Sequence, residues 1–176
     1  NGRADLAMGV AATSTSVSGL QLQDLGEVTF VFAVAPFHPL ASCTAAITDE
    51  MLLEHRLIVV ADSAQKERIS MGLLHGQDIF TVDTIQAKIQ AQIRGLGCGF
   101  LPETLALPYL QSGLLVAKGV TRSTRQLRMR YAWKKPNTGG LGKALQWWLS
   151  QLESTITQQA LLSHRCQRQP ALPNAC

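Results

Sequence analysis

The chain has 176 residues and a mass of 19.1 kDa, which is enough for one ordinary domain or two small lobes with a buried core. Hydrophobic residues make up 46% of the sequence and charged residues 16%, so most of the chain should be ordered. No apolar run approaches the roughly 20 residues of a membrane-spanning helix, and we expect no membrane contact.

The net charge of +4 is distributed unevenly along the chain. Residues 1–103 contain 6 basic and 11 acidic side chains, whereas residues 104–176 contain 10 basic side chains and one acidic side chain. A basic half can attract polyanions. However, no groove-docking motif accompanies these basic residues, so we expect a solvated surface rather than a sequence-reading nucleic-acid interface.

Four cysteines lie at positions 43, 98, 166 and 176, without a CxxC pair or the histidine spacing of a zinc site. Cys43 and Cys98 have apolar neighbours and are expected to be buried or half-buried thiols. Unpaired cysteines are typical of a reducing compartment, so we expect a cytoplasmic protein. Because the ligand spacing of a zinc site is missing, we expect no metal, and we expect no cofactor either.

The first half of the sequence predicts short strands separated by loops and helices. Residues 4–10 form an apolar run typical of a buried strand. Residues 27–35 are rich in β-branched and aromatic side chains and predict a strand that stops at Pro36. Thr48 can cap a short helix, and residues 57–61 predict another buried strand.

The middle of the sequence has the clearest pattern. Residues 79–82 predict a strand, and residues 84–94 predict a helix that ends at Gly95, with three isoleucines on one face: Ile85, Ile89 and Ile93. Residues 98–101 predict the next strand, and Pro102 suits the start of another helix. A strand, a helix and a strand at this spacing favour a right-handed crossover between two parallel strands.

Strands are expected again over residues 114–120 and 127–133. An amphipathic helix then follows, and its apolar residues recur at spacings of three and four: Leu141, Leu145, Trp148, Leu149, Leu152 and Ile156. We expect Trp148 in the core and Trp147 off the apolar face. From about Thr157 the composition predicts a mobile tail. The alternation of strands and helices assigns the chain to the α/β class.

Residues 95–99 (GLGCG) admit two enzymatic interpretations, and both fail. A dinucleotide-binding loop follows a strand and opens a helix, whereas here the helix comes first. Cys98 lacks the strand-turn-helix elbow of a nucleophile, and the sequence places no histidine beside it as a base. We interpret Cys98 as a structural cysteine and predict no catalytic residue and no enzymatic activity.

Binding is the remaining interpretation. Asp62, Ser63 and Ala64 stand where a strand is expected to end and a helix to begin, so the free amides of that turn can donate to an anion or a carboxylate. Helix capping by Asp62 or Ser63 is the alternative, because every such junction carries free amides. A second lobe facing this junction across a crevice would favour the ligand interpretation.

Five segments, taken in order, carry a resemblance to a known family. They are NGRADLAMGV (1–10), EVTFVFAVAPFHPLAS (27–42), LLEHRLIVVADS (52–63), VDTIQAKIQAQIRGLGCGFLPETLA (82–106) and LQSGLLV (110–116). The most specific parts are a strand followed by His38-Pro39-Leu40, and the succession of a helix, Gly95-Leu96-Gly97, a strand and Leu101-Pro102. Over about residues 1–156 the sequence resembles the effector-binding domain of a LysR-type transcriptional regulator.

The resemblance implies a periplasmic-binding-protein-like fold of type II, in which two α/β lobes are joined by two crossing strands and an effector binds between them. Residues 1–30 and 128–158 would form the first lobe, truncated at its N-terminus, residues 31–127 the second lobe, and residues 159–176 the tail. Family members begin with a winged helix-turn-helix, a linker helix and the opening strand and helix of the first lobe, none of which precedes Asn1. DNA binding is therefore expected to belong to a part of the protein outside this sequence. The resemblance also implies a homo-oligomer, either a dimer or a tetramer.

Carried over residue by residue, the resemblance implies eight effector-binding positions. Val10 would supply an apolar wall, and Ser63 would donate through its hydroxyl and amide to a carboxylate or carbonyl group of a small-molecule effector. The set comprises Gly9 and Val10 at the end of the first strand, Asp62, Ser63 and Ala64 at the helix start, Asp83 and Thr84 at the next strand end, and Gln126 near the returning strand.

Two other functions stay open. A solute-binding protein shares this fold and would carry a secretion signal upstream of Asn1. An enzyme on a two-lobed α/β scaffold would need a catalytic group in the crevice, and the sequence singles out none.

Overall fold

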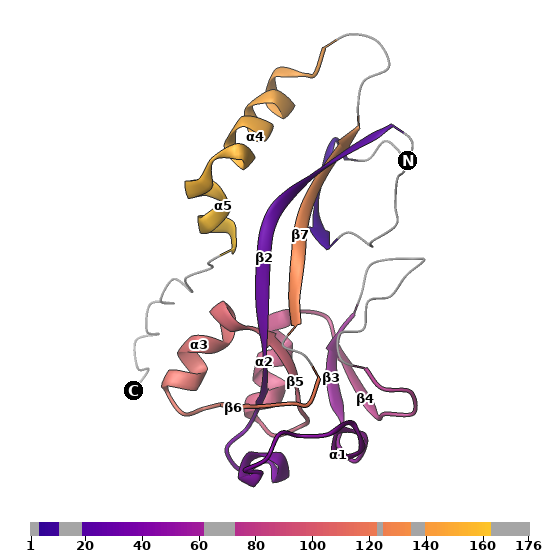
Figure 1. Ribbon diagram of the computed structural model, residues 1–176, viewed down its shortest axis with the longest axis vertical. Helices are drawn as coiled ribbons and strands as arrows, with labels where there is room; N and C mark the ends of the chain where they lie inside the picture. The colour runs from indigo at the N-terminus through magenta and orange to yellow at the C-terminus, as the bar shows by residue number, and fades with distance from the viewer. Residues whose placement is uncertain (1–3, 11–18, 62–72, 123–124, 135–139, 163–176) are drawn as a thin grey trace, which may run out of the picture.

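A computed structural model describes residues 4–10, 19–61, 73–122, 125–134 and 140–162 of the chain. Strand β2 (Leu20–Val34), together with β7 (Arg125–Lys134), joins an upper group of elements to a lower group (Figure 1). We call the upper group the first lobe; it holds β1 (Leu6–Val10), α4 (Lys143–Glu153) and α5 (Thr155–Leu162). The lower group is the second lobe. The α/β class expected from the sequence is confirmed, and none of the described helices is long and apolar enough to cross a membrane.

The two connecting strands pair antiparallel over the whole length of β7, with a bulge between Asp24 and Gly26. Strand β2 begins at Leu20 rather than at residue 27. Residues 20–24 (LQLQD) alternate apolar and polar side chains with the period of a strand, and all five are exposed. Gly26 has a φ of 143°, and Leu162 at the end of α5 lies so close that a side chain at position 26 would collide with it.

Strand β1 pairs antiparallel with β7, with Val10 opposite Met129. The strand expected over residues 4–10 is confirmed, but the expectation that it is buried is wrong, since Met8 is 50% exposed. Within the described chain β7 is the only hydrogen-bonded neighbour of β1. An edge strand keeps more of its surface in contact with solvent than a central strand does.

The C-terminal helix is broken where the sequence predicted one continuous helix. Ser154 adopts an extended backbone (ψ 123°) between α4 and α5, and Gln158 Nε2 donates to Leu152 O at 2.7 Å, which satisfies a carbonyl at the end of α4. Serine is a favoured residue at such a junction because it caps a following helix well. Helix α5 then continues to Leu162, so the expectation of a mobile tail from about Thr157 is wrong for residues up to 162, and residues 163–176 lie outside the described residues.

The apolar face of α4 is narrower than the sequence predicted. Leu152 is fully buried and packs in a cluster with Leu25 and Tyr131. The expectation that Trp148 lies in the core is wrong: it is 46% exposed, close to the 56% of its neighbour Trp147.

The second lobe is built on five strands in the order β4 (Ile79–Val82), β3 (Leu57–Val60), β5 (Gly99–Pro102), β2 and β6 (Val116–Lys118). Strands β3 and β4 form a two-stranded sheet that meets the other three strands at a single bridge, and we call the five strands together the second-lobe sheet. Strands β3 and β4 pair in parallel, and a parallel bridge between Leu57 and Cys98 connects β3 to the start of β5. The sequence predicted β4 and β5 as a parallel pair. They are instead the two parallel neighbours of β3, because the connection through α2 (Ile85–Ile93) crosses over that strand.

A glycine permits the contact between β3 and β5. A Cβ atom at Gly97 would lie 2.5 Å from Arg56 O, which is closer than such atoms approach. Without that side chain, the Cys98 amide donates to Arg56 O at 2.9 Å and the Ile58 amide donates to Cys98 O at 2.9 Å. These two bonds place the start of β5 beside β3.

The second-lobe helices begin and end where local signals predicted. Thr48 Oγ1 accepts from the Met51 amide at 3.4 Å at the start of α1 (Asp49–Leu53), so its role as a cap is confirmed. Gly95, with a φ of 72°, follows the end of α2, as expected of a glycine in the left-handed region. Helix α3 (Glu103–Gln111) starts directly after Pro102.

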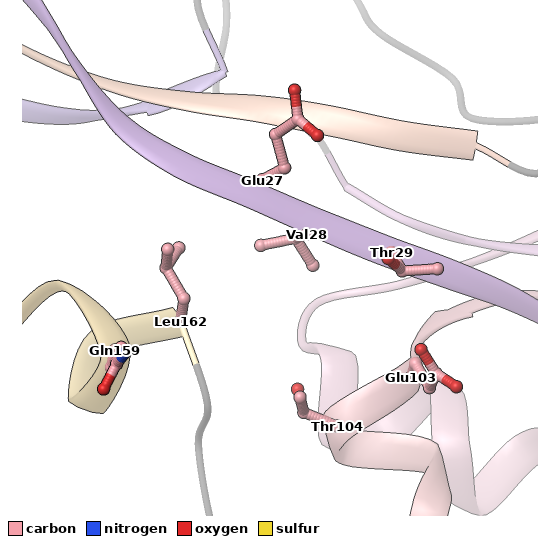
Figure 2. Close-up of a pocket in the computed structure, with 7 residues that line it drawn as sticks. All are labelled: Glu27, Val28, Thr29, Glu103, Thr104, Gln159 and Leu162. Carbon is pink, nitrogen blue, oxygen red and sulfur yellow. The ribbon is translucent and has the colours of Figure 1, made fainter.

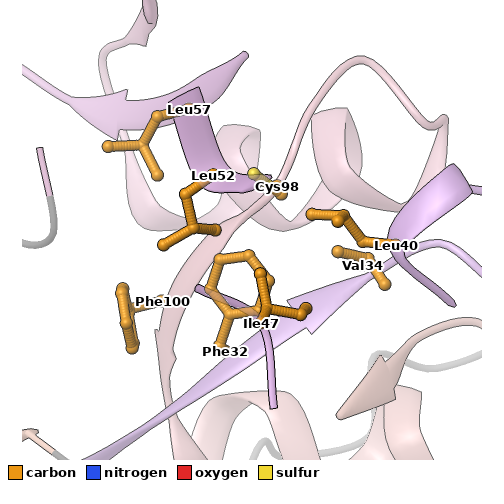
Figure 3. Close-up of a cluster of buried hydrophobic side chains, with 8 residues drawn as sticks. All are labelled: Phe32, Val34, Leu40, Ile47, Leu52, Leu57, Cys98 and Phe100. Carbon is orange, nitrogen blue, oxygen red and sulfur yellow. The ribbon is translucent and has the colours of Figure 1, made fainter. Parts of the chain in front are cut away.

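The central strands β2 and β5 of the second-lobe sheet are buried on both faces. One face packs against η1 (Pro39–Ser42) and α1 through a cluster shown in Figure 3: Phe32, Val34, Leu40, Ile47, Leu52, Leu57, Cys98 and Phe100. The other face packs against α2 and α3 through a second cluster: Ala33, Ile89, Leu101, Ala106 and Leu115. Consecutive residues of β2 therefore belong to different cores, which explains the continuous apolar run in the sequence.

Candidate functional site

The carboxyl ends of β3 and β4 lie together at one edge of the second-lobe sheet. The Ala61 amide donates to Val82 O at 2.7 Å, which holds the two strand ends in register. From these ends the chain continues into residues 62–64 and into residues 83–84. Asp62, Ser63 and Ala64, like most of the helix expected after them, lie outside the described residues.

Thr84 begins α2, and its side chain serves as the helix cap. Its Oγ1 accepts from the Ala87 amide at 3.1 Å, while its backbone is extended with a φ of −137°. The amides of Ile85 and Gln86 precede the first intrahelical donor, so they can donate to a group outside the helix. The helix dipole favours a negative charge at this position. Asp83 stands next to the cap and is exposed.

Gly9 and Val10 lie at the end of β1, with Val10 opposite Met129 of β7. Gln126 is three residues before Met129, about 10 Å along the same strand, and is exposed. Figure 1 shows β1 ending on the same side of the β2–β7 pair as the carboxyl ends of β3 and β4. The segments that end at Val10 and that lead into Asp83 and Thr84 therefore lie on one side of the connecting strands, while Gln126 is exposed on the connecting strand β7 itself.

A groove of about 390 Å³ lies on the other side of β2 (Figure 2). Both lobes and the connecting strand line it: Glu27, Val28 and Thr29 come from β2, Glu103 and Thr104 from α3, and Gln159 and Leu162 from α5. None of the five described residues expected at the effector site lines it. Sequence reasoning missed the groove because its walls come from three segments that lie far apart in the chain and share no motif.

Sequence reasoning also missed two buried polar side chains of α2. Lys88 is 5% exposed and Gln92 is fully buried, one helical turn apart. They lie directly beside Ile89 and Ile93, so the buried arc of the helix is wider than the isoleucine stripe. Burial lowers the pKa of Lys88 to about 8, and the nearby Cys98 opposes this shift.

Cys98 has the properties of a structural residue. It is fully buried, and its Sγ donates to Arg56 O at 3.4 Å. Burial raises the pKa of its thiol to about 11, so the thiolate is scarce at neutral pH and the group is unreactive. In the part of the chain that the structure describes, no three His, Cys, Asp or Glu side chains gather as metal ligands would.

The family model of the LysR substrate binding domain matches residues 1–156. The chain belongs to the LysR substrate-binding domain family. This confirms the resemblance inferred from the sequence.

Two relatives of this LysR domain are HTH-type transcriptional regulators. The uncharacterized regulator YeeY of Escherichia coli (strain K12) is 37% identical over 152 residues, which are 86% of this chain and 48% of the relative. The activator AllS of Klebsiella pneumoniae is 36% identical over 114 residues, which are 64% of this chain and 42% of the relative. The chain thus spans about half the length of these relatives.

Solved structures of LysR regulators have the same fold. The regulatory domain of NMB2055 (MetR) from N. meningitidis matches with a TM-score of 0.69 at 24% identity. The match covers 92% of this chain and 72% of the NMB2055 chain. The effector binding domain of QuiR in complex with shikimate matches with a TM-score of 0.62 at 15% identity. That match covers 83% of this chain and 68% of the QuiR chain. These likenesses confirm the two-lobed fold.

Proposed function

We propose that the chain is the effector-sensing domain of a LysR-type transcription regulator and binds a small molecule between its two lobes. The observation that carries this proposal is the family match over residues 1–156. The regulator would act in the cytoplasm as a homo-oligomer and would bind DNA through another part of the protein. The domain itself would catalyse no reaction.

The proposed effector site comprises the eight positions named from the sequence. Its support is geometric: β1 and the β3–β4 pair belong to different lobes but end on the same side of the connecting strands (Figure 1). A molecule that contacts both lobes favours one relative arrangement of them, because it binds that arrangement more tightly than the others. Such a shift is a physical means of passing the binding signal to the rest of a regulator.

The solved structures of similar proteins indicate that the ligand is a small molecule. The solved neighbours include regulatory domains in complex with 2-PG and with shikimate, and a full-length regulator with bound effector Arg. We propose that this chain also binds a small molecule, and we do not assign any of these three compounds to it.

The test is a thermal-shift screen of small metabolites on the chain, followed by calorimetric titration of each compound that stabilises it. Gln126→Ala should weaken binding about ten- to a hundredfold, as expected for the loss of a hydrogen bond to a charged group. Ser63→Ala should act in the same direction. Gln111→Ala, which removes an exposed glutamine at the end of α3, is the matched control and should leave the affinity unchanged.

Two results would contradict the proposal. One is the absence of any stabilising metabolite. The other is a ligand whose affinity is unaffected by Gln126→Ala and Ser63→Ala but falls on substitution of Thr104 in the groove of Figure 2.

A further inference from the structure

The groove behind β2 lies where the described part of the chain stops. Leu162 is the last residue of α5 and the last described residue, and it lines the groove together with Gln159. Glu103 and Thr104, the first two residues of α3, line the groove from the second lobe (Figure 2). The chain that follows Leu162 is therefore joined directly to one wall of this groove.

The groove is acidic. The three elements that line it, β2, α3 and α5, carry Asp24, Glu27 and Glu103 and contain no lysine or arginine. Glu103 offsets the positive end of the α3 dipole, whereas α5 ends at the groove with its negative end and with carbonyls that lack intrahelical donors. The groove therefore favours a cationic group.

Glu103 has no cationic partner among the described residues. Glu27, the other carboxylate of the groove, lies 3.4 Å from Arg128 of β7. The ion pairs of the described chain do not include Glu103, which is exposed. A cation that pairs with Glu103 must come from the rest of the chain or from another molecule.

The sequence after Leu162 contains such cations. Residues 163–168 (SHRCQR) include Arg165 and Arg168, and no aspartate or glutamate occurs in residues 163–176. Arg165 is three residues beyond Leu162, and three extended residues span about 10 Å. This reach is sufficient for the arginine to enter a groove that Leu162 itself lines. The match to the family model ends at residue 156, so the segment lies beyond the matched residues.

We propose that residues 163–168 bind in the groove behind β2 and that Arg165 pairs with Glu103. The aliphatic stem of the arginine would pack on the apolar side chains of Val28 and Leu162, while its guanidinium group would donate to the carboxylate. The segment continues from α5 of the first lobe and would contact α3 of the second lobe. It would thus connect the two lobes across the back of β2, independently of any effector.

The first experiment uses Cys166, next to Arg165, as a probe of where the segment lies. Thr104→Cys places a thiol in the groove, and the matched control Gln111→Cys places one at the exposed far end of α3, about 10 Å along the helix. Both variants are made in the full chain with Cys176→Ser, and are oxidised with glutathione disulfide. Non-reducing gels and peptide mass mapping follow the disulfide. The bond from Cys166 to position 104 should form about tenfold faster than the bond to position 111.

The second experiment measures the coupling between the two charges. Arg165→Gln is made in the wild-type chain and in Glu103→Gln, and urea unfolding gives the unfolding equilibrium constant. Arg165→Gln should raise this constant about two- to fivefold in the wild type, as for a partly exposed ion pair, and should leave it unchanged in Glu103→Gln. The control Arg94→Gln, at an exposed position after α2, should have the same effect in both backgrounds.

Three results would overturn the inference. Equal rates of disulfide formation at positions 104 and 111 would show that the segment does not dwell in the groove. Equal effects of Arg165→Gln in both backgrounds would show that Arg165 does not pair with Glu103. A disulfide between two copies of the chain, in place of one within a single copy, would show that another molecule fills the groove. None of these results depends on effector sensing, which the metabolite screen tests separately.

Discussion

His38 shows how a single side chain couples local structure to pH. It stands before η1, and its Nδ1 accepts from the Leu40 amide at 3.2 Å, so the unprotonated ring caps the turn. The centre of the His55 ring lies 5.0 Å away. Burial, and then the charge of His55, lower the pKa of His38 below its ordinary value of 6.5. Protonation would put a hydrogen on the nitrogen that now accepts the bond.

We expect the free energy of unfolding to fall as the pH drops below 6.5, because the unfolded chain binds a proton on His38 before the folded chain does. The contribution of the neutral His38 ring to the free energy of unfolding is fully present above pH 6.5. It is lost as the pH falls from 6.5 to the lowered pKa of His38 in the folded chain. Urea unfolding between pH 7.5 and 5.5 measures it. His38→Asn keeps a capping oxygen without a titrating ring, so its stability should depend less on pH. The control is His75→Asn at an exposed position, and a pH dependence in His38→Asn equal to that of wild type would contradict the assignment.

At the scale of elements, α4 illustrates that periodicity locates a helix but not its depth of burial. The spacing of its leucines predicted a helix, and Leu152 is indeed enclosed by Leu25 and Tyr131. Trp148 satisfies the same spacing but lies at the border of the buried arc. Which residues of an amphipathic helix reach the core depends on how the helix rotates against its sheet, and the local sequence does not encode that angle.

Leu152→Ala should lower the free energy of unfolding by about 2 to 5 kcal/mol, as for other fully buried leucines. Trp148→Ala should cost less than Leu152→Ala, although it removes a larger side chain, because 46% of Trp148 is already exposed. Urea unfolding of both variants tests the order. A loss for Trp148→Ala equal to or above that for Leu152→Ala would mean that α4 is rotated differently on the sheet.

At the scale of the whole molecule, tertiary structure brings together charges that the sequence separates. The C-terminal half is basic and the N-terminal half is acidic. Because β2 and β7 pair antiparallel, acidic side chains of the first half lie beside basic side chains of the second. Arg130 lies 2.7 Å from Asp24, and Arg128 lies 3.4 Å from Glu27. These exposed pairs contribute little stability, but they reduce the local positive potential that a polyanion would meet.

We therefore expect this chain to bind duplex DNA weakly, without sequence preference, and only at low salt, since its cations can act through phosphates alone. Fluorescence anisotropy with two unrelated duplexes at about 50 and 200 mM salt tests this expectation. Nanomolar binding that selects one duplex at the higher salt concentration would refute it.

The sequence by itself determined the elements whose causes are local. Thr48 and Thr84 cap helices because their hydroxyls reach amides three residues ahead, and Gly95 ends α2 because it adopts a positive φ without strain. The order of such segments was also enough to assign the family and the fold class. Short-range hydrogen bonds and steric limits act within a few residues, so their signals remain legible in a single sequence.

Only the tertiary structure decided which elements meet. It made β3 the neighbour of both β4 and β5, left β1 exposed at an edge, and buried the side chain of Lys88 against Gly99. Five of the eight expected effector residues fall within the described chain, while the groove behind β2 carried no sequence signal. The burial of a side chain depends on how the faces of helices and sheets pack together. A pattern of apolar residues shows that a helix or strand has an apolar face, but it does not specify which other element packs against that face.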